Sequence, residues 1–295
     1  YNFDLTSMVS CLSNAIEDSE IYNEIIIGDD GCEKSYRSTF HKLARLKKVR
    51  LLVSEKNIGR AAIRNRLAEI ASCDYLLYID ADALIPASAS QYLDKWVNYM
   101  NISPVMCGGT AYRDVPPNDP DRYLRWQYGY YKEQKCAKKR NRKPYASFSG
   151  FNFLIEKEVL KRVRFNEELR NYGHEDTLLG YQLMKAGIPL LHIDNQLIHD
   201  GLDNNREFII KTREGVQNLS ILYDKVTDKK AFIRSVKLLG VFEKLHTIGI
   251  TRVLALIYKK NKRRIEIMLR SRKSSLKIFS VYKLGLFCYY RHGYK

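Results

Sequence analysis

Residues 74–85 read DYLLYIDADALI, and this stretch decides the fold that we expect. The run 75–79 is almost continuously apolar, which is typical of a strand buried on both faces of a parallel sheet. It ends in Asp-Ala-Asp at 80–82, at the strand end where open α/β sheets bind ligands. Two carboxylates spaced in this way can share a divalent cation, or divide between a cation and a sugar hydroxyl. Alternatively, one of them caps the helix expected to start near Ser88.

Helix-like and strand-like segments alternate on both sides of this stretch. Apolar residues three and four apart predict helices, and short apolar runs predict strands. The alternation indicates right-handed βαβ units and an α/β fold with a mostly parallel sheet flanked by helices. The predicted helices are 5–16, 36–46, 61–71, 89–100 and 175–184, and the predicted strands are 24–28, 49–53, 75–79, 105–111, 147–155, 190–193 and 196–201.

The periodicity fails from residue 114 to residue 145. Two prolines and the basic run 138–143 favour a mobile crossover or lid near an anionic ligand. Aromatic and basic residues also interleave here, as they do in proteins that bind nucleic acid.

Charge divides the chain near residue 225. Residues 225–295 hold 19 Lys or Arg and 3 Asp or Glu, a balance of +16, whereas residues 1–224 hold 31 and 30, a balance of +1. The six cysteines have no metal-ligand spacing, and unpaired thiols favour a reducing, cytoplasmic compartment. The sequence has no uninterrupted apolar run long enough to span a bilayer.

Several short motifs follow one another at intervals that form a pattern. The motifs are GDDG at 28–31, Asn57-x-Gly59, Ala62-x-Arg64-Asn65, DAD at 80–82, SGFN at 149–152, HED at 174–176 and His199. This ordered set resembles the inverting GT-A glycosyltransferases of family 2 over roughly residues 1–220. We therefore expect a GT-A nucleotide-sugar glycosyltransferase domain at 1–224 and a basic amphipathic helical region at 225–295.

The resemblance implies a donor site for a UDP-sugar. Asp29 or Asp30 would accept the uracil N3–H, as in this family, and Arg64 would bind the diphosphate through its guanidinium. Gly150 and Asn152 would line the donor site. The alternative for Arg64 is an exposed position on a helix.

The resemblance also implies a metal site and a base. Asp82 and His199 would hold Mn²⁺ (or Mg²⁺) on the diphosphate, with Asp80 reaching the ribose or a metal-bound water. Asp176 would remove the proton of the acceptor hydroxyl, and Glu175 would orient acceptor or base, so that one displacement inverts the anomeric carbon. Alternatively, the two acids suit a helix dipole, and a lone histidine after an apolar pair is usually structural.

The expected reaction is hexosyl transfer to a hydroxyl of a glycan or lipid-linked acceptor, in bacterial surface polysaccharide synthesis. A catalytically inactive family relative that acts as an assembly subunit is the main alternative. A nucleic-acid-binding protein would explain the charge, but the basic residues avoid the body and the expected cleft is acidic, so we expect no nucleic acid partner. A nucleotide-dependent oxidoreductase would need a G-x-G-x-x-G turn, which follows none of the strands.

The two ends of the sequence carry two further expectations. Family members begin with an apolar strand that ends in Tyr-Asn, whereas this sequence begins at Tyr1-Asn2, so we expect the natural polypeptide to carry such a strand before Tyr1.

In 225–295, basic amphipathic segments and a final apolar-aromatic patch at 284–290 predict a peripheral location on the inner face of the plasma membrane, on anionic lipid. The alternative is that this region packs on the body or forms a homodimer contact.

Overall fold

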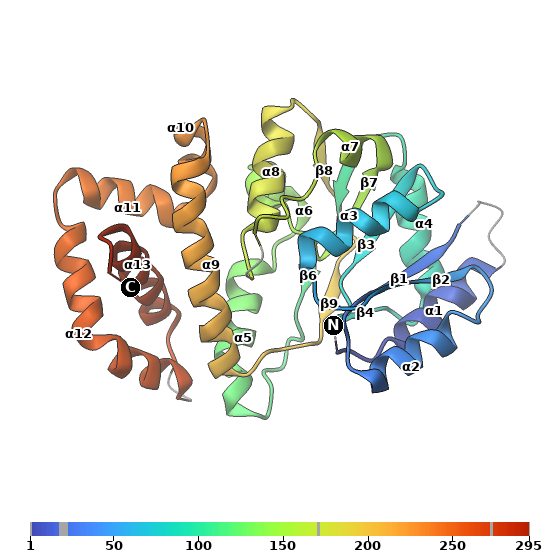
Figure 1. Cartoon of the computed structure of the whole chain (residues 1–295), viewed down its shortest axis with the longest axis horizontal. Helices are drawn as coiled ribbons and strands as arrows, with labels where there is room; N and C mark the ends of the chain where they lie inside the picture. Colours follow the sequence, from blue (N-terminus) through green and yellow to red (C-terminus); the bar gives the residue numbers. More distant parts are fainter. Residues whose placement is uncertain (1, 18–22, 170–171, 272–273, 295) are drawn as a thin grey trace. The chain divides into compact units, whose positions relative to one another are not determined.

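The computed structural model describes residues 2–17, 23–169, 172–271 and 274–294 (Figure 1). The chain forms two compact units. The first comprises residues 1–111, 135–170 and 178–201, and the second comprises residues 112–134, 171–177 and 202–295. Helix α9 ends at Lys225, next to the boundary predicted between residues 224 and 225, and a division of function at that point stays a prediction.

The strands all belong to the first unit. They are β1 (Ile25–Asp30), β2 (Val49–Ser54), β3 (Tyr75–Ile79), β4 (Ala83–Leu84), β5 (Val105–Cys107), β6 (Thr110–Ala111), β7 (Asn152–Glu156), β8 (Leu190–His192) and β9 (Leu197–His199).

Five helices lie close to their predicted positions. They are α1 (Thr6–Glu17), α2 (Lys34–Leu43), α3 (Arg60–Ile70), α4 (Ala89–Tyr99) and α8 (Glu175–Lys185). Two further helices, α7 (Lys157–Arg162) and α9 (Asn205–Lys225), were not predicted. The region predicted to be helical after residue 224 contains α10 (Lys229–Ser235), α11 (Lys237–Thr247), α12 (Thr251–Arg270) and α13 (Leu276–Arg291).

The α/β class is confirmed, with helices on both faces of the main sheet, whose strand order is β3-β7-β5-β8. Its strands supply alternate side chains to two cores, as the period of two requires. Val105, Phe153 and Ile155 point into a core with α3, α7 and α8. Met106 and Leu154 point into another core with α1 and α4. The run 75–79 is apolar throughout because its side chains pack against both cores, although β3 lies at the edge of this sheet and only Leu76 is buried rather than partly exposed.

The expected parallel direction holds for only some of the described strand pairs. β1 with β2, β5 with β8 and β6 with β9 are parallel, whereas β7 is antiparallel to β3 and β5, and β4 to β9. β7 is antiparallel because the chain returns to the sheet at the same strand ends from which it left. Its first residue, Asn152, pairs with Ile79 at the end of β3, and Phe153 pairs with Cys107 at the end of β5. A strand parallel to β3 and β5 would need a connection that crosses back to the amino-terminal ends of these strands.

Two predicted strands are shorter than expected. The strand predicted at 105–111 is interrupted at Gly108 and Gly109, where Gly109 has a φ of 94° and a side chain there would lie 2.7 Å from the guanidinium of Arg140. The strand predicted at 147–155 begins only at Asn152, so the Ser-Gly-Phe part of its motif forms the turn before β7.

The segment predicted to be an irregular lid is largely helical. It contains short turns of helix, and Leu124, Arg125 and Trp126 of α5 are buried. Within the basic run, Arg140 is also buried, where it donates hydrogen bonds to the carbonyl oxygens of Cys107, Gly108 and Ile193. The ordered elements are η1 (Pro120–Arg122), α5 (Tyr123–Tyr128), η2 (Gly129–Glu133), α6 (Ala137–Arg140) and η3 (Tyr145–Ser147).

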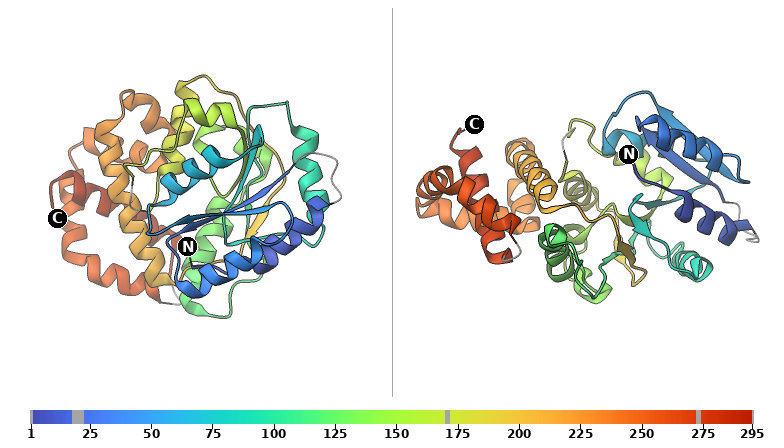
Figure 2. Two further views of the ribbon diagram at one scale, coloured as in Figure 1. Left: turned by 45° about the vertical axis from the view of Figure 1, so that its right-hand side comes forward. Right: turned by 90° about the horizontal axis from the view of Figure 1, so that it is seen from below.

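The second unit is built from helices that gather around α13 (Figures 1 and 2). α13 packs against α9, α11 and α12. Its side chains Phe279, Tyr282, Leu286 and Phe287 are almost fully buried. The apolar-aromatic patch predicted at 284–290 to face a membrane is therefore largely part of a helical core, which corrects that detail of the prediction.

Candidate active site

Asp80, directly after β3, is held by two arginines of α3. Nη2 of Arg64 lies 2.7 Å from Oδ1 of Asp80 and 3.0 Å from the carbonyl oxygen of Gly150. Nη2 of Arg60 lies 2.5 Å from Oδ2 of Asp80. Residues four apart on a helix share a face, which is why both guanidinium groups reach the same carboxylate.

This cluster carries more positive than negative charge. Burial alone would raise the pKa of Asp80, but the charges of Arg60 and Arg64 outweigh burial and hold the pKa below its usual value. Asp80 is therefore a carboxylate at neutral pH and balances one of the two arginines. The Arg60 side chain is 44% exposed and the Arg64 side chain 7%, so Arg60 is the one turned to solvent.

Asp82 and His199 form the second part of the site. Oδ2 of Asp82 lies 3.3 Å from Nε2 of His199, which is at the long end of hydrogen-bond distances. The ring of His199 stacks on Phe151 with centroids 5.3 Å apart, which fixes its orientation. Backbone pairing brings the residues together, because Ala83 of β4 pairs with His199 of β9 and the amide of Asp200 donates to the carbonyl oxygen of Asp82.

The donor set fits a divalent cation that is bound together with a further ligand. Two ligand atoms that each lie about 2.1 Å from one ion are about 3.0 to 3.4 Å apart when the angle at the ion is between 90° and the tetrahedral value. The 3.3 Å between Oδ2 of Asp82 and Nε2 of His199 lies in that range. Oδ1 of Asp82 is buried and has no hydrogen-bond partner among the described residues. No group of three or more His, Cys, Asp or Glu in the described part of the chain could hold a metal ion.

The Asp82 carboxyl is crowded and partly buried. Burial raises its pKa, and the charge of Asp80 adds to that rise, while positive charge on His199 opposes it. A Cβ on Gly201 would lie 2.5 Å from Cβ of Asp82 and 3.0 Å from its Oδ2. Only glycine at position 201 therefore allows this approach of the chain to Asp82.

Neither carboxylate caps helix α4. The helix starts near Ser88, as predicted, but the residue at its N-cap is Ser88 itself, and the side chains of Asp80 and Asp82 are directed to Arg60, Arg64 and His199. The capping alternative for this Asp-Ala-Asp motif is therefore wrong.

Asp29 and Asp30 serve the backbone of the loops that follow β1 and β2. Asp29 is fully buried; it accepts from the amide of Cys32 at 2.7 Å and from Nε of Arg37 at 2.6 Å. A contact between Asp29 and uracil stays a prediction. Asp30, 6% exposed, accepts from the amides of Ile58 and Gly59, and its contact with a nucleotide stays a prediction.

Asn152 is buried in the first unit. Its side-chain amide donates to the carbonyl oxygens of Gly109 and Asn195, and its Oδ1 accepts from the hydroxyl of Tyr92. It is 1% exposed. Its contact with the donor stays a prediction. Gly150, also predicted there, is buried and reaches the site through its carbonyl oxygen on Arg64.

Glu175 and Asp176 open α8 and belong to the second unit. The preceding turn is left-handed at two residues, with φ of 99° at Gly173 and 70° at His174. The amide of Asn218 in α9 donates to the carbonyl oxygen of Gly173 and fixes the turn. Glu175 is buried, whereas Asp176 is partly exposed. The roles predicted for both acids stay predictions.

Sequence reasoning missed three residues of the site. Arg60 carried no signal, because it precedes the arginine of the recognised motif. Phe151 was included in a predicted strand and in the SGFN motif but was given no role of its own, and Gly201 was only the end of a segment. The signal for Gly201 was its place two residues after a predicted metal ligand, where a glycine often permits close approach.

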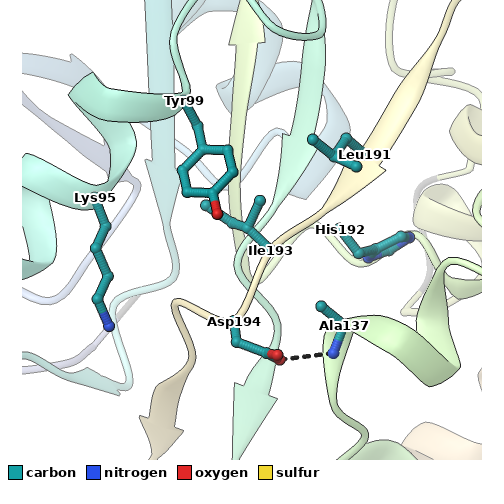
Figure 3. A pocket seen from close by; sticks show the side chains of 7 residues that line it. All are labelled: Lys95, Tyr99, Ala137, Leu191, His192, Ile193 and Asp194. Carbon is teal, nitrogen blue, oxygen red and sulfur yellow. Dashed lines mark hydrogen bonds between the residues drawn. The ribbon is translucent and has the colours of Figure 1, made fainter.

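A separate hollow of about 370 Å³ lies on the first unit, at the end of β8 (Figure 3). Its only charged side chains are Lys95 and Asp194, and Oδ1 of Asp194 accepts from the amide of Ala137. None of the predicted site residues lines it, so the hollow is distinct from the cluster around Asp80 and Asp82.

The cluster at the end of β3 and the fold around it define a class of protein, and sequence comparison gives the family. Residues 5–164, more than half of the chain, match the family described as glycosyl transferase family 2. The chain belongs to this family, which confirms the resemblance stated from its motifs.

Relatives and solved structures agree with this membership. An uncharacterized glycosyltransferase of Haemophilus influenzae is 28% identical over 177 residues, 57% of this chain and 61% of that protein. A chondroitin synthase of Escherichia coli is 25% identical over 225 residues, 66% of this chain but 32% of that protein. The chain thus spans less than two thirds of either relative. The fold is similar to that of the mannosyltransferase PcManGT from Pyrobaculum calidifontis, solved with GDP-Man and Mn²⁺ (TM-score 0.56, 14% identity, 98% of this chain and 83% of the other).

Proposed function

We propose that this protein transfers a sugar from a UDP-sugar to a hydroxyl of a glycan or lipid-linked acceptor. The observation that carries the proposal is the joint position of Asp80, Asp82 and His199 with two arginines at the carboxyl end of β3. Nucleotide sugars carry a diphosphate, and such a group requires cations on its oxygens. The similarity to a mannosyltransferase that binds GDP-Man and Mn²⁺ supports a metal and a nucleotide-sugar donor.

The chain's own residues would bind the donor in distinct ways. Arg60 is the exposed cation, and its guanidinium can bind phosphate oxygens in a bidentate manner. Arg64 is buried and keeps Asp80 and the turn at Gly150 in place. Asp80, ionised and partly buried, would accept a hydrogen bond from a ribose hydroxyl or from a metal-bound water once Arg60 turned to the diphosphate.

Asp82 and His199 would hold Mn²⁺, or Mg²⁺, together with the donor. A carboxylate and an imidazole favour Mn²⁺ over the all-oxygen sites that Mg²⁺ prefers. When bound, the metal neutralises negative charge on the departing diphosphate. Two protein ligands leave most of the coordination sphere to the nucleotide, so metal binding at this pair should depend on the nucleotide and be weak without it.

Asp176 is proposed as the base that removes the acceptor hydroxyl proton, with Glu175 orienting acceptor or base. A carboxylate base at hydrogen-bond distance from the attacking hydroxyl is the usual device for this step. A single displacement would invert the anomeric carbon. The support is the family membership and the His-Glu-Asp motif at the start of α8.

The acceptor is proposed to be a growing bacterial surface polysaccharide or its lipid-linked precursor. The relative named chondroitin synthase supports a glycan product.

A panel of nucleotide sugars tests the proposal. Purified protein would be incubated with UDP- and GDP-linked hexoses and N-acetylhexosamines, and release of the nucleotide would be measured with Mn²⁺ and with a chelator. We expect Mn²⁺-dependent hydrolysis of a UDP-sugar. Binding of UDP-sugars without hydrolysis or transfer would instead support the inactive relative, and hydrolysis that resists chelation would contradict the metal assignment.

A further inference from the structure

Helix α12 has one side in the core of the second unit. Thr251, Ala255, Tyr258 and Leu269 are buried, at spacings that place them on one side of a helix, and α12 packs on α13. These buried residues are sufficient to pack the helix onto its neighbours, so apolar residues elsewhere on α12 need another explanation.

The opposite side of α12 is apolar as well, and it is exposed. At 100° per residue, four large aliphatic side chains lie on this side, away from the buried ones. A fifth, Ile248, is 63% exposed in the turn before the helix. Apolar side chains gathered in this way mark an interaction surface rather than ordinary solvent exposure. The four are Val253 at 54% exposed, Leu256 at 49%, Ile257 at 52% and Ile267 at 68%.

Cations lie between these apolar residues. Lys260 and Arg264 are exposed on the same side, and Arg263 is adjacent. α12 contains seven Lys or Arg and a single acid, Glu266. That acid is directed into the unit, where the hydroxyl of Tyr282 donates to it at 3.1 Å. The exposed side therefore receives no compensating negative charge from its own helix.

We propose that this surface, the α12 face, docks onto a membrane rich in anionic lipid headgroups. The α12 face consists of Val253, Leu256, Ile257, Lys260, Arg264 and Ile267. An interfacial helix inserts aliphatic side chains among the headgroups while its cations bind their phosphates, and this face supplies both. None of the helices in the described ranges is long and apolar enough to cross a membrane, so α12 would lie in the plane of the surface.

Charge favours the lipid surface over a second copy of the chain. A symmetric pairing of two α12 faces would bring Lys260 and Arg264 against the same cations of the other copy, and like charges across an interface are unfavourable. The proposal is independent of the donor chemistry, because none of the residues of the α12 face belongs to the candidate active site.

Flotation of the full chain with vesicles tests this proposal. Vesicles of phosphatidylcholine alone would be compared with vesicles that also contain phosphatidylglycerol, at low and high salt. We expect binding to the anionic vesicles alone and release by salt. The double variant Lys260→Glu with Arg264→Glu should weaken binding by at least about 20-fold, since each cation contributes about fivefold. Leu256→Ser with Ile257→Ser should weaken it by at least about tenfold.

Matched variants control for general effects of charge and exposure. Lys34→Glu with Lys42→Glu changes two exposed cations of α2, and Val115→Ser changes an aliphatic side chain that is 74% exposed. Both should bind vesicles like the wild type, and all variants should keep its thermal midpoint. Equal binding by the α12 variants and the wild type would overturn the proposal. So would binding that ignores lipid charge, or a wild-type dimer that Leu256→Ser with Ile257→Ser converts to monomer in sedimentation.

Discussion

Oδ2 of Asp82 lies 3.3 Å from Nε2 of His199, and the backbone around the two residues fixes that relationship. Asp82 precedes β4 and His199 ends β9, and these strands pair directly. Because the main chain and the stacked ring of Phe151 place both side chains, the pair is preorganised for a ligand. This is the feature on which the proposed metal-dependent chemistry depends most.

Gly201→Ala should disturb the pair without unfolding the protein. The new Cβ would lie 2.5 Å from Cβ of Asp82, so the carboxylate must move. We expect Mn²⁺-dependent nucleotide binding to weaken by at least about tenfold, since metal ligands tolerate little displacement, and stability to fall by about 1–3 kcal/mol. Calorimetric titration and thermal unfolding measure the two effects.

Gly240→Ala in α11 is the matched control. An added Cβ there meets only the carbonyl oxygen of Ile233, at 3.9 Å, and alanine should stabilise the helix by about 0.5–1 kcal/mol. Undiminished nucleotide binding by Gly201→Ala would show that the position of Asp82 does not matter for the metal.

Arg64→Lys should weaken donor binding although the charge is kept. Arg64 donates to Oδ1 of Asp80 and to the carbonyl oxygen of Gly150 through one nitrogen, Nη2, which the planar guanidinium holds in place. A lysine ammonium is a point charge on a flexible stem and does not hold a donor in that position. We expect nucleotide affinity to fall by about tenfold, the loss of one charge-assisted hydrogen bond. Arg66→Lys, an exposed position on the same helix, should have no effect. If both variants bind the nucleotide like the wild type, the hydrogen bonds of the Arg64 guanidinium have no part in the donor site.

Asp176→Asn should separate binding from transfer. Removal of a general base lowers the rate of transfer by about 10²-fold or more, while donor affinity should stay within about twofold. Initial rates with the donor identified by the panel, together with nucleotide titration, give both quantities. Near wild-type transfer in Asp176→Asn, together with a large loss in Glu175→Gln, would move the role of base to Glu175.

His192 should make the protein less stable in acid. Burial, and then the nearby Arg140, lower the pKa of His192 from 6.5 to about 4, although its Nε2 lies 3.0 Å from the carbonyl oxygen of Pro144. Below pH 6.5 the unfolded chain therefore binds a proton that the folded chain does not. The contribution of neutral His192 is complete above pH 6.5 and is lost as the pH falls toward 4, by up to about 3 kcal/mol.

Denaturant unfolding at pH 7 and at pH 4.5 measures this effect. Burial also lowers the pKa of His174 to about 4, so the difference between wild type and His192→Gln isolates one residue. The variant should lose less stability between the two pH values than the wild type does. Equal losses in both proteins would contradict the assignment.

The sequence predicted the local elements well, because burial on one or two faces leaves a period in the chain. The helix at Thr6–Glu17 and the strand at Tyr75–Ile79 are examples. The direction of β7 was not predictable in this way. The spacing of apolar residues shows that a strand is buried, but it does not show at which end of the neighbouring strands the chain returns to the sheet. The interruption at Gly108 and Gly109 depends on Arg140, which is distant in sequence.

The site was predicted in part for similar reasons. The motifs led us to predict Asp82 and His199 as ligands of one metal ion, and the structure brings the two side chains into contact. It could not show that Asp29 is fully buried with Arg37, because a strand-end carboxylate that binds a ligand and one that binds the next loop look alike in sequence. In the basic region, composition showed the charge, but only the packing of α13 separates its core residues from the exposed α12 face.

The central claim is that Asp82 and His199 hold a metal together with the nucleotide. Calorimetric titration of UDP and GDP, with Mn²⁺ and with a chelator, tests it most directly when wild type is compared with His199→Ala and with His41→Ala, an exposed histidine on α2. We predict that Mn²⁺ strengthens nucleotide binding at least about tenfold in wild type and in His41→Ala. In His199→Ala this gain should vanish while the thermal midpoint is kept. A His199→Ala variant with the full Mn²⁺-dependent gain would contradict the account.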